Sequence, residues 1–146
     1  MDSQPGSYVV ILRNRQHVRV EIGRLRTLKI DPGYFIYVGS AFGPGGVRAR
    51  VLRHSRKAKA LHWHVDYLRE KTGFDSAWYS HDPRKLEHAW AEVFSRLPGY
   101  SAIEGFGCSD CRCHSHLFFN PVFPDISEFL KNIEQPVKIW KPGPVT

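Results

Sequence analysis

Cysteine, long apolar runs and acidic residues are scarce in this sequence of 146 residues. The three cysteines all lie between positions 108 and 113, an odd number spaced too closely for a disulfide framework. No segment approaches the roughly 20 apolar residues that a membrane-spanning helix requires. Residues 1–6 are acidic and turn-like, and the apolar run after them is short, so we expect no secretory signal. We therefore expect a cytoplasmic protein whose thiols are reduced or bind a metal ion.

The chain has 14 acidic residues and 21 lysines and arginines, which gives a formal net charge of +7. Such an excess favours polyanionic partners, because each cation placed against a phosphate releases a condensed counterion. A basic surface that serves solubility alone is the alternative interpretation. Hydrophobic residues make up 42% of the chain and aromatic residues 13%, which indicates a packed globule rather than disorder.

The apolar patterns predict one α+β domain over residues 1–146, with its core over about 6–120 and a last helix and tail over 121–146. Strands are expected over 6–13, 18–22, 34–38, 74–80 and 116–119, with a hairpin return or an irregular connection over 23–30. Helices are expected after the glycines at 43–46, over 61–71, from Asp82 and Pro83 to Leu97, and over 126–133. We expect a small central sheet, mixed or antiparallel, flanked by these helices.

The segment from Gly33 onward carries the strongest signals for function. An aromatic, β-branched strand runs into a glycine turn and then into a helix whose cations have no acidic residue among them. The predicted nucleic-acid contacts are Arg48, Arg53, His54, Arg56, Lys57 and Lys59. Residues two apart on a helix point in different directions, so one arginine should face a site while the others face solvent or nucleic-acid backbone. His54 could contact phosphate or cap its helix.

Hydrolysis of a phosphodiester needs a positioned nucleophile, a proton acceptor and positive charge on the phosphoryl oxygens. Glu87 is the candidate carboxylate for a divalent ion, although an ordinary acidic residue in a first helical turn is the alternative. Tyr8 and Tyr37 are the candidates for positioning the nucleophile or moving its proton. Their alternative interpretation is as sheet aromatics with hydroxyls at the surface.

The polar aromatic segment over 61–68 contains a second set of metal-ligating residue types. His62 and Asp66 are four residues apart, so they could meet on one helix face as metal ligands or as a histidine-carboxylate pair. His64 lies between them as a further accessory candidate. A purely structural pair is the alternative interpretation.

A third set lies in the loop before the last predicted strand. Its residue types suit tetrahedral zinc, and the candidate ligands are Cys108, Cys111, Cys113 and His116. The alternative is a tight turn in which Ser109 and Asp110 bond backbone amides and the cysteines are small buried hydrophobes.

These segments together resemble the GIY-YIG nuclease superfamily. Gly6-Ser7-Tyr8 stands where that superfamily has its GIY element, and Tyr37-Val38-Gly39 stands where it has YIG. Arg50 matches the family's helical arginine, and Glu87 matches its metal-binding glutamate. Asn120 is the nearest candidate for a late asparagine of the family. The long stretch between Tyr8 and Tyr37 is expected to hold an inserted hairpin.

More narrowly, the chain resembles a branch of small GIY-YIG-like domains of uncharacterised function, found in archaea and bacteria. The motifs that carry this resemblance are Gly33 to Ala41, Arg53-His54, His62 to Leu68 and Gly105 to Leu117. The resemblance implies a DNA endonuclease of repair or recombination with one Mg²⁺ or Mn²⁺ held by Glu87. It also implies that Tyr37 and Tyr8 orient and deprotonate water while Arg50 steadies the phosphate. A non-catalytic nucleic-acid-binding module and a zinc-stabilised adaptor are the alternatives.

Overall fold

The structure, a computed structural model, describes residues 1–23, 26–57, 60–61, 63–104 and 115–143. In this part of the chain, six strands form an antiparallel sheet in the order β6-β7-β4-β1-β5-β8, and β2 pairs with β3 in a separate hairpin. The strands are β1 (Gly6–Asn14), β2 (Val18–Ile22), β3 (Arg26–Ile30), β4 (Gly33–Ala41), β5 (Gly73–Ser80), β6 (Ser101–Ala102), β7 (Leu117–Asn120) and β8 (Lys138–Trp140). The helices are α1 (Gly46–His54), α2 (His64–Lys71), α3 (Glu87–Arg96) and α4 (Ile126–Leu130).

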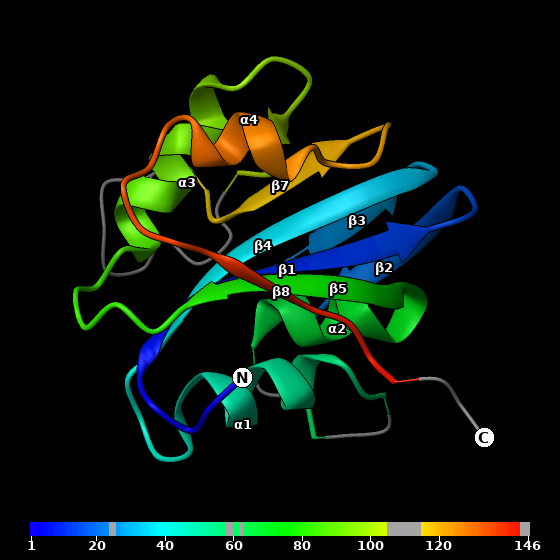
Figure 1. Cartoon of the computed structure of the whole chain (residues 1–146). Coiled ribbons are helices and arrows are strands. Elements are labelled where there is room, and N and C mark those ends of the chain that lie inside the picture. The colour runs from blue at the N-terminus through cyan, green and yellow to red at the C-terminus, as the bar shows by residue number, and fades with distance from the viewer. Residues whose placement is uncertain (24–25, 58–59, 62, 105–114, 144–146) are drawn as a thin grey trace.

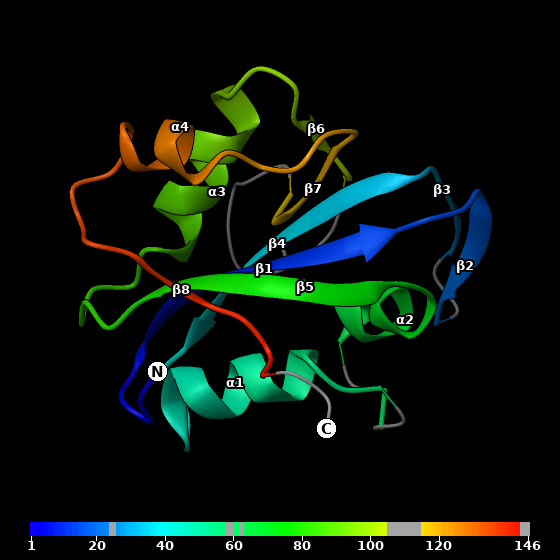
Figure 2. The same ribbon diagram turned by 45° about the vertical axis from the view of Figure 1, so that its right-hand side comes forward.

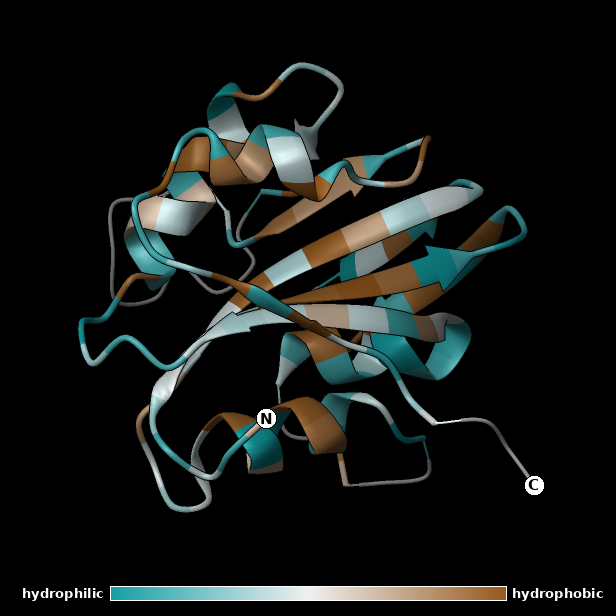
Figure 3. Ribbon diagram, viewed as in Figure 1, coloured by the Kyte–Doolittle hydropathy of each residue, from teal (hydrophilic) through white to brown (hydrophobic). Residues whose placement is uncertain are grey.

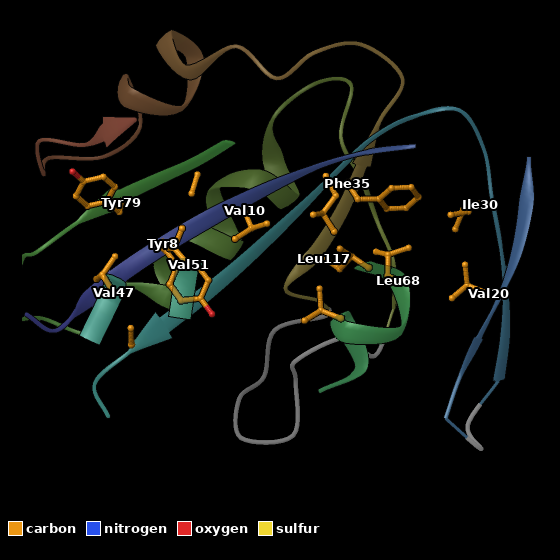
Figure 4. Packing of buried hydrophobic residues seen from close by; sticks show 14 of the residues in the cluster. Tyr8, Val10, Val20, Ile30, Phe35, Val47, Val51, Leu68, Tyr79 and Leu117 are labelled. Atoms are coloured by element: carbon orange, nitrogen blue, oxygen red, sulfur yellow. The ribbon is translucent and has the colours of Figure 1, made fainter. Parts of the chain in front are cut away.

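Strand β1 lies in the middle of the sheet, between β4 and β5, and both of its faces are buried. Its even-numbered apolar residues, such as Val10, pack in a core formed with α1, α2 and the β2–β3 hairpin (Figure 4). Its odd-numbered apolar residues, Val9 and Ile11, pack in a second core under α3 and α4. Figure 1 shows these helix pairs on opposite sides of the sheet. The fold is therefore α+β with an antiparallel sheet, which confirms the predicted class.

The hydropathy of each residue follows this layering. Apolar residues concentrate along the central strands β1 and β4 (Figure 3). Trp78 and Trp90, at 2% and 1% exposure, are among the largest side chains of the core under α3. Full burial of one large apolar side chain stabilises a fold by about 1.5–3 kcal/mol.

The insertion predicted between Tyr8 and Tyr37 is the β2–β3 hairpin. It lies beside α2 at the end of β1, as the turned view shows (Figure 2). Its inward residues Val20, Ile22 and Ile30 are 1–3% exposed and extend the core on that side of the sheet. The hairpin thus lies at the end of β1 that carries Asn14, and Tyr8 lies near the other end.

Several predicted boundaries are wrong. Strand β4 continues to Ala41 rather than ending at Val38, and α4 ends at Leu130 rather than Ile133. Helix α2 begins at His64 rather than Leu61, because Asp66 accepts a hydrogen bond from the Trp63 amide and so closes the first turn. Leu61 is 44% exposed outside the helix.

Helix α3 begins at Glu87 rather than at Asp82 and Pro83. The Asp82 carboxylate accepts a hydrogen bond from the amide of Arg84, only two residues on, and so forms a turn instead of a helix cap. Glu87 is consequently the first residue of α3 and does not lie one turn into it.

The predicted tail also contains a strand, β8, which pairs with β5 along Ala77 to Tyr79.

Among the described residues, no helix is both long enough and apolar enough to cross a membrane.

Candidate active site

A pocket of about 370 Å³ opens at the edge of β4, beyond the end of β7. Strand β7 pairs with β4 only over Tyr34 to Tyr37, and β4 continues to Ala41, so Gly39 and Ser40 line the pocket. Its walls come from β1, β4, α1, the start of α3 and the residue that precedes α2. The lining residues are Tyr8, Tyr37, Gly39, Ser40, Arg50, Trp63, Lys85, Glu87 and His88.

The sheet register places the two predicted tyrosines together. Tyr8 lies opposite Gly39, and Val10 lies opposite Tyr37, so the tyrosines are diagonal neighbours on one face of the sheet. A Cβ atom at Gly39 would lie 2.4 Å from the Tyr8 hydroxyl oxygen and ring. The missing side chain at Gly39 is therefore what makes room for Tyr8.

Tyr8 is 2% exposed, and its hydroxyl oxygen lies 3.0 Å from Nε2 of His54. Burial raises the pKa of Tyr8 well above its ordinary value, and the neighbouring Tyr37 and Glu87 act in the same direction. The charge of Arg50 and its side-chain hydrogen bond to Tyr8 oppose this rise in pKa without cancelling it. Tyr8 is therefore a neutral hydrogen-bonding group at neutral pH and not a phenolate.

Arg50 is the α1 arginine that faces the pocket. The helix is held by the N-terminal segment, whose Gln4 carbonyl accepts a hydrogen bond from the Val47 amide at 3.0 Å. Gly46 has φ 58°, and a Cβ there would lie 2.1 Å from the Ser3 carbonyl oxygen, so only glycine fits this contact. The Arg50 guanidinium lies 4.7 Å from the centre of the Trp63 ring, a cation–π distance.

Glu87 reaches the pocket from the start of α3, where its side chain is 23% exposed. Its Oε1 atom lies 3.5 Å from Nδ1 of His116, and Nε2 of His116 lies 3.4 Å from Nδ1 of His88. One ligand atom from each of these three residues lies within 4.8 Å of the others, so the group could hold a metal ion.

Four residues predicted from the sequence thus converge on one pocket: Tyr8, Tyr37, Arg50 and Glu87. They come from β1, β4, α1 and α3. The combination offers two hydroxyl groups, a guanidinium and a carboxylate facing a common space. Such a set can position a phosphate, orient water and contribute a metal ligand.

Two of the predicted nucleic-acid contacts are placed elsewhere. His54 is 1% exposed behind Tyr8, so its side chain does not reach the surface where the prediction put it. Arg53 donates two hydrogen bonds, of 2.7 and 2.8 Å, to the carboxylate of the fully buried Asp66. Its guanidinium also lies 4.3 Å from the centre of the Trp63 ring. These contacts hold α1 against α2, and His62, the other residue of the predicted pair with Asp66, lies outside the described residues.

The remaining predicted cations that the structure describes are on the surface. Arg48, Arg56 and Lys57 are exposed, and so is His64 in the first turn of α2. Lys57 also lines a second pocket, of about 300 Å³, with Arg13, Arg15 and Lys71. Asn120, at the far end of β7, lies opposite Tyr34 and does not line the site pocket. Lys59, His62, Cys108, Cys111 and Cys113 lie outside the described residues.

Sequence reasoning missed three contributors to the site. Trp63 and Lys85 line the pocket, and His88 adds an imidazole beside Glu87. The histidine that directly follows the candidate glutamate was a usable signal. Trp63 gave none, because its contact with Arg50 depends on how α1 and α2 pack. His116 was predicted as a zinc ligand with cysteines, and among the described residues it lies with Glu87 and His88.

Comparison with protein-family models gives a match over residues 7–138 to the family described as Domain of unknown function DUF123. Neither the curated proteins nor the solved structures include a match to the chain. The matched range begins one residue before Tyr8 and contains all four of the converging residues.

Proposed function

Since the chain belongs to the DUF123 family, we propose that its pocket hydrolyses phosphodiester bonds in DNA with the help of a divalent metal ion at Glu87. The observation that carries this proposal is the convergence of Tyr8, Tyr37, Arg50 and Glu87 on one pocket. The resemblance to GIY-YIG nucleases named the same four residues from sequence motifs alone. A shared pocket is what a joint role of these residues requires.

The residues around Glu87 fit a divalent ion by their chemistry. Its carboxylate has two imidazoles nearby, and all three groups offer lone pairs within 4.8 Å of one another. A bound ion would supply positive charge to the phosphoryl oxygens and increase the acidity of water. The protein's own task is then to place substrate and water against that charge.

Arg50 and Tyr37 would hold the scissile phosphate. The guanidinium can donate two hydrogen bonds to phosphate oxygens, and Trp63 keeps it in place from one side. Tyr37 is only partly buried, so its hydroxyl can reach a substrate in the pocket. Lys85 adds a second cation to the pocket wall.

Tyr8 would orient the attacking water rather than deprotonate it unaided, because its raised pKa keeps the hydroxyl protonated. The contact with His54 offers the hydroxyl a route for its proton, since the two polar atoms are 3.0 Å apart. His54 is anchored in turn because its carbonyl accepts a 2.8 Å hydrogen bond from Arg69. The contact between Tyr8 and His54 would keep the Tyr8 hydroxyl in one orientation during the reaction.

A non-catalytic nucleic-acid-binding module is the second candidate, and the exposed cations favour it equally. Four cations line the second pocket against one carboxylate, Asp75, so this surface suits a polyanion whether or not a bond is cut. The two functions differ in what Glu87 contributes. A nuclease needs its carboxylate for turnover, whereas a binding module does not.

The test is cleavage of labelled single-stranded, duplex, flap and branched DNA in Mg²⁺, Mn²⁺ or Zn²⁺ by the native protein and by Glu87→Gln. Glu92→Gln is the matched control, because Glu92 is an exposed glutamate on the same helix. We expect cleavage to fall by about 100-fold or more in Glu87→Gln with DNA binding retained, as for loss of a group essential to the chemistry. Binding by all three proteins without cleavage of any substrate would favour the binding module.

A further inference from the structure

His116 is a buried histidine whose place is fixed by the sheet. Its side chain is 1% exposed, and its carbonyl accepts a 2.9 Å hydrogen bond from the Val38 amide of β4. The next residue, Leu117, lies opposite Tyr37 in the β4–β7 pairing. The imidazole is therefore held beside the pocket by backbone contacts of its own residue and of the residue that follows it.

Glu87 and His88 reach the same point from the start of α3. The residue before them, Leu86, is buried, and its amide donates a 3.2 Å hydrogen bond to the Ser7 hydroxyl of β1. The Leu86 carbonyl accepts the first bond of the helix from Trp90, at 2.9 Å. The end of α3 is thus fixed to the sheet, and both side chains line the pocket.

The spacing of the three side chains is wider than that of ordinary hydrogen bonds. Glu87 and His116 approach to 3.5 Å, and His88 and His116 approach to 3.4 Å. Hydrogen bonds between such groups are usually about 2.7–3.2 Å long. The two contacts use opposite ring nitrogens of His116, and one ion can bind only one of them. The metal site therefore rests on the arrangement in which one ligand atom from each of the three residues lies within 4.8 Å of the other two.

We propose that Glu87, His88 and His116 form a three-ligand site for a divalent transition-metal ion of the zinc type, open toward the pocket. Imidazole suits zinc and the later first-row metals, whereas Mg²⁺ prefers oxygen ligands. Two histidines and a glutamate leave a fourth position for water or substrate, as in catalytic zinc sites. Only the ion's role in hydrolysis rests on the proposed function, and the binding site itself does not.

The test is titration of the full chain, stripped of metal, with Zn²⁺ by calorimetry and with Co²⁺ by absorption spectroscopy. We expect one ion per chain with an affinity that falls at least tenfold in His88→Ala and in Glu87→Gln. Both positions are at the surface of α3, so these variants should keep the fold. His17→Ala is the matched control, because it removes a histidine whose side chain is 80% exposed on a different part of the chain. Excess Mg²⁺ should not displace the bound Zn²⁺.

The cysteines at 108, 111 and 113 are the competing ligands, and cobalt distinguishes them because thiolate ligation adds an intense charge-transfer absorption. We expect a cobalt spectrum without that absorption and unchanged affinity in Cys111→Ser. Unchanged zinc affinity in both His88→Ala and Glu87→Gln, or loss of binding in Cys111→Ser with a thiolate spectrum, would overturn the site.

The site and the proposed function can fail separately. If zinc binding depends on His88 and Glu87 but the protein cuts no DNA, the metal site is supported and the nuclease function is refuted. If cleavage depends on Glu87 but zinc affinity is unchanged in His88→Ala and Glu87→Gln, the nuclease function is supported and this zinc site is refuted.

Discussion

The hydroxyl oxygen of Tyr8 lies 3.0 Å from Nε2 of His54, so a residue of β1 and the last residue of α1 form one buried polar pair. Tyr8→Phe removes the hydroxyl and keeps the ring. We expect a loss of about 1–3 kcal/mol in the free energy of unfolding, because the imidazole loses a buried hydrogen-bond partner. Denaturant unfolding of the native and variant proteins measures this loss.

Under the proposed function, Tyr8→Phe also lowers turnover by about 100-fold or more without weakening DNA binding. Tyr79→Phe is a suitable control, since Tyr79 lies opposite Tyr8 on the neighbouring strand and does not line the pocket. Equal turnover in the native protein and Tyr8→Phe would remove Tyr8 from the reaction.

Gly39→Ala should perturb the pocket through Tyr8. The new Cβ would lie 2.4 Å from the tyrosine ring, and the buried ring can move only by disturbing the core around it. We expect a destabilisation of about 1–3 kcal/mol, as for other overpacked cores. Gly43→Ala is the control, because its Cβ would meet only the end of Arg50, at 3.7 Å. Thermal unfolding of both variants tests the contrast, and equal midpoints would contradict it.

Asp66→Asn should be among the most destabilising changes of a charged residue. It removes the negative charge from a fully buried group that accepts two hydrogen bonds from Arg53 and caps α2. We expect a loss of about 3 kcal/mol or more, because the Arg53 charge stays partly buried without its counter-charge. Glu92→Gln breaks an exposed pair with Arg96 and should cost less than about 0.5 kcal/mol. Chemical denaturation compares the two, and similar losses would show that Asp66 contributes no more than a surface charge.

Tyr100 should make stability depend on alkaline pH. Partial burial raises its pKa to about 12 from 10.0, with the contact to Asn120 opposing the rise. The folded state therefore binds the phenolic proton more tightly, so this stabilisation is complete below pH 10.0 and is lost as pH rises through about 12. Solvent screening keeps the effect below about 2 kcal/mol. Tyr100→Phe keeps the ring beside Phe94 and removes the hydroxyl that titrates. Between pH 10.0 and about 12, the free energy of unfolding of this variant should therefore fall less than that of the native protein. Equal losses in the two proteins would contradict the expectation.

Exposed cations on the α1 side of the sheet should control DNA affinity. Arg48→Glu and Lys57→Glu together should weaken binding at least tenfold and reduce its salt dependence, because fewer counterions are released. Lys131→Glu is the control for each single reversal, since it makes the same charge change as Arg48→Glu or Lys57→Glu alone, in an exposed residue at the end of α4 on the opposite face. Fluorescence anisotropy at several salt concentrations measures both effects. Equal weakening by all the charge reversals would indicate an effect of net charge rather than of this surface.

Several elements could be predicted from local sequence because they depend on neighbouring residues. The apolar residues over 6–13 predicted a strand, and β1 is that strand, in the middle of the sheet. The glycines at 43–46 correctly separated β4 from α1. Helix starts were less predictable. Asp82 and Asp66 are both plausible caps, and their role depends on whether each carboxylate meets the amide two or three residues on.

By itself, the sequence determined the fold class, the basic helix and the four residue types that line the pocket, because strand and helix periodicity and motif spacing are local properties. Only the tertiary structure decided which partners those side chains have. The register of β1 on β4 set Tyr8 over Gly39, packing of α1 on α2 paired Arg53 with Asp66, and the approach of β7 to α3 brought His116 to His88. The physical reason is that these contacts join positions 31, 13 and 28 residues apart in the chain, whose separation in space is set by burial of the two cores rather than by the chain between them.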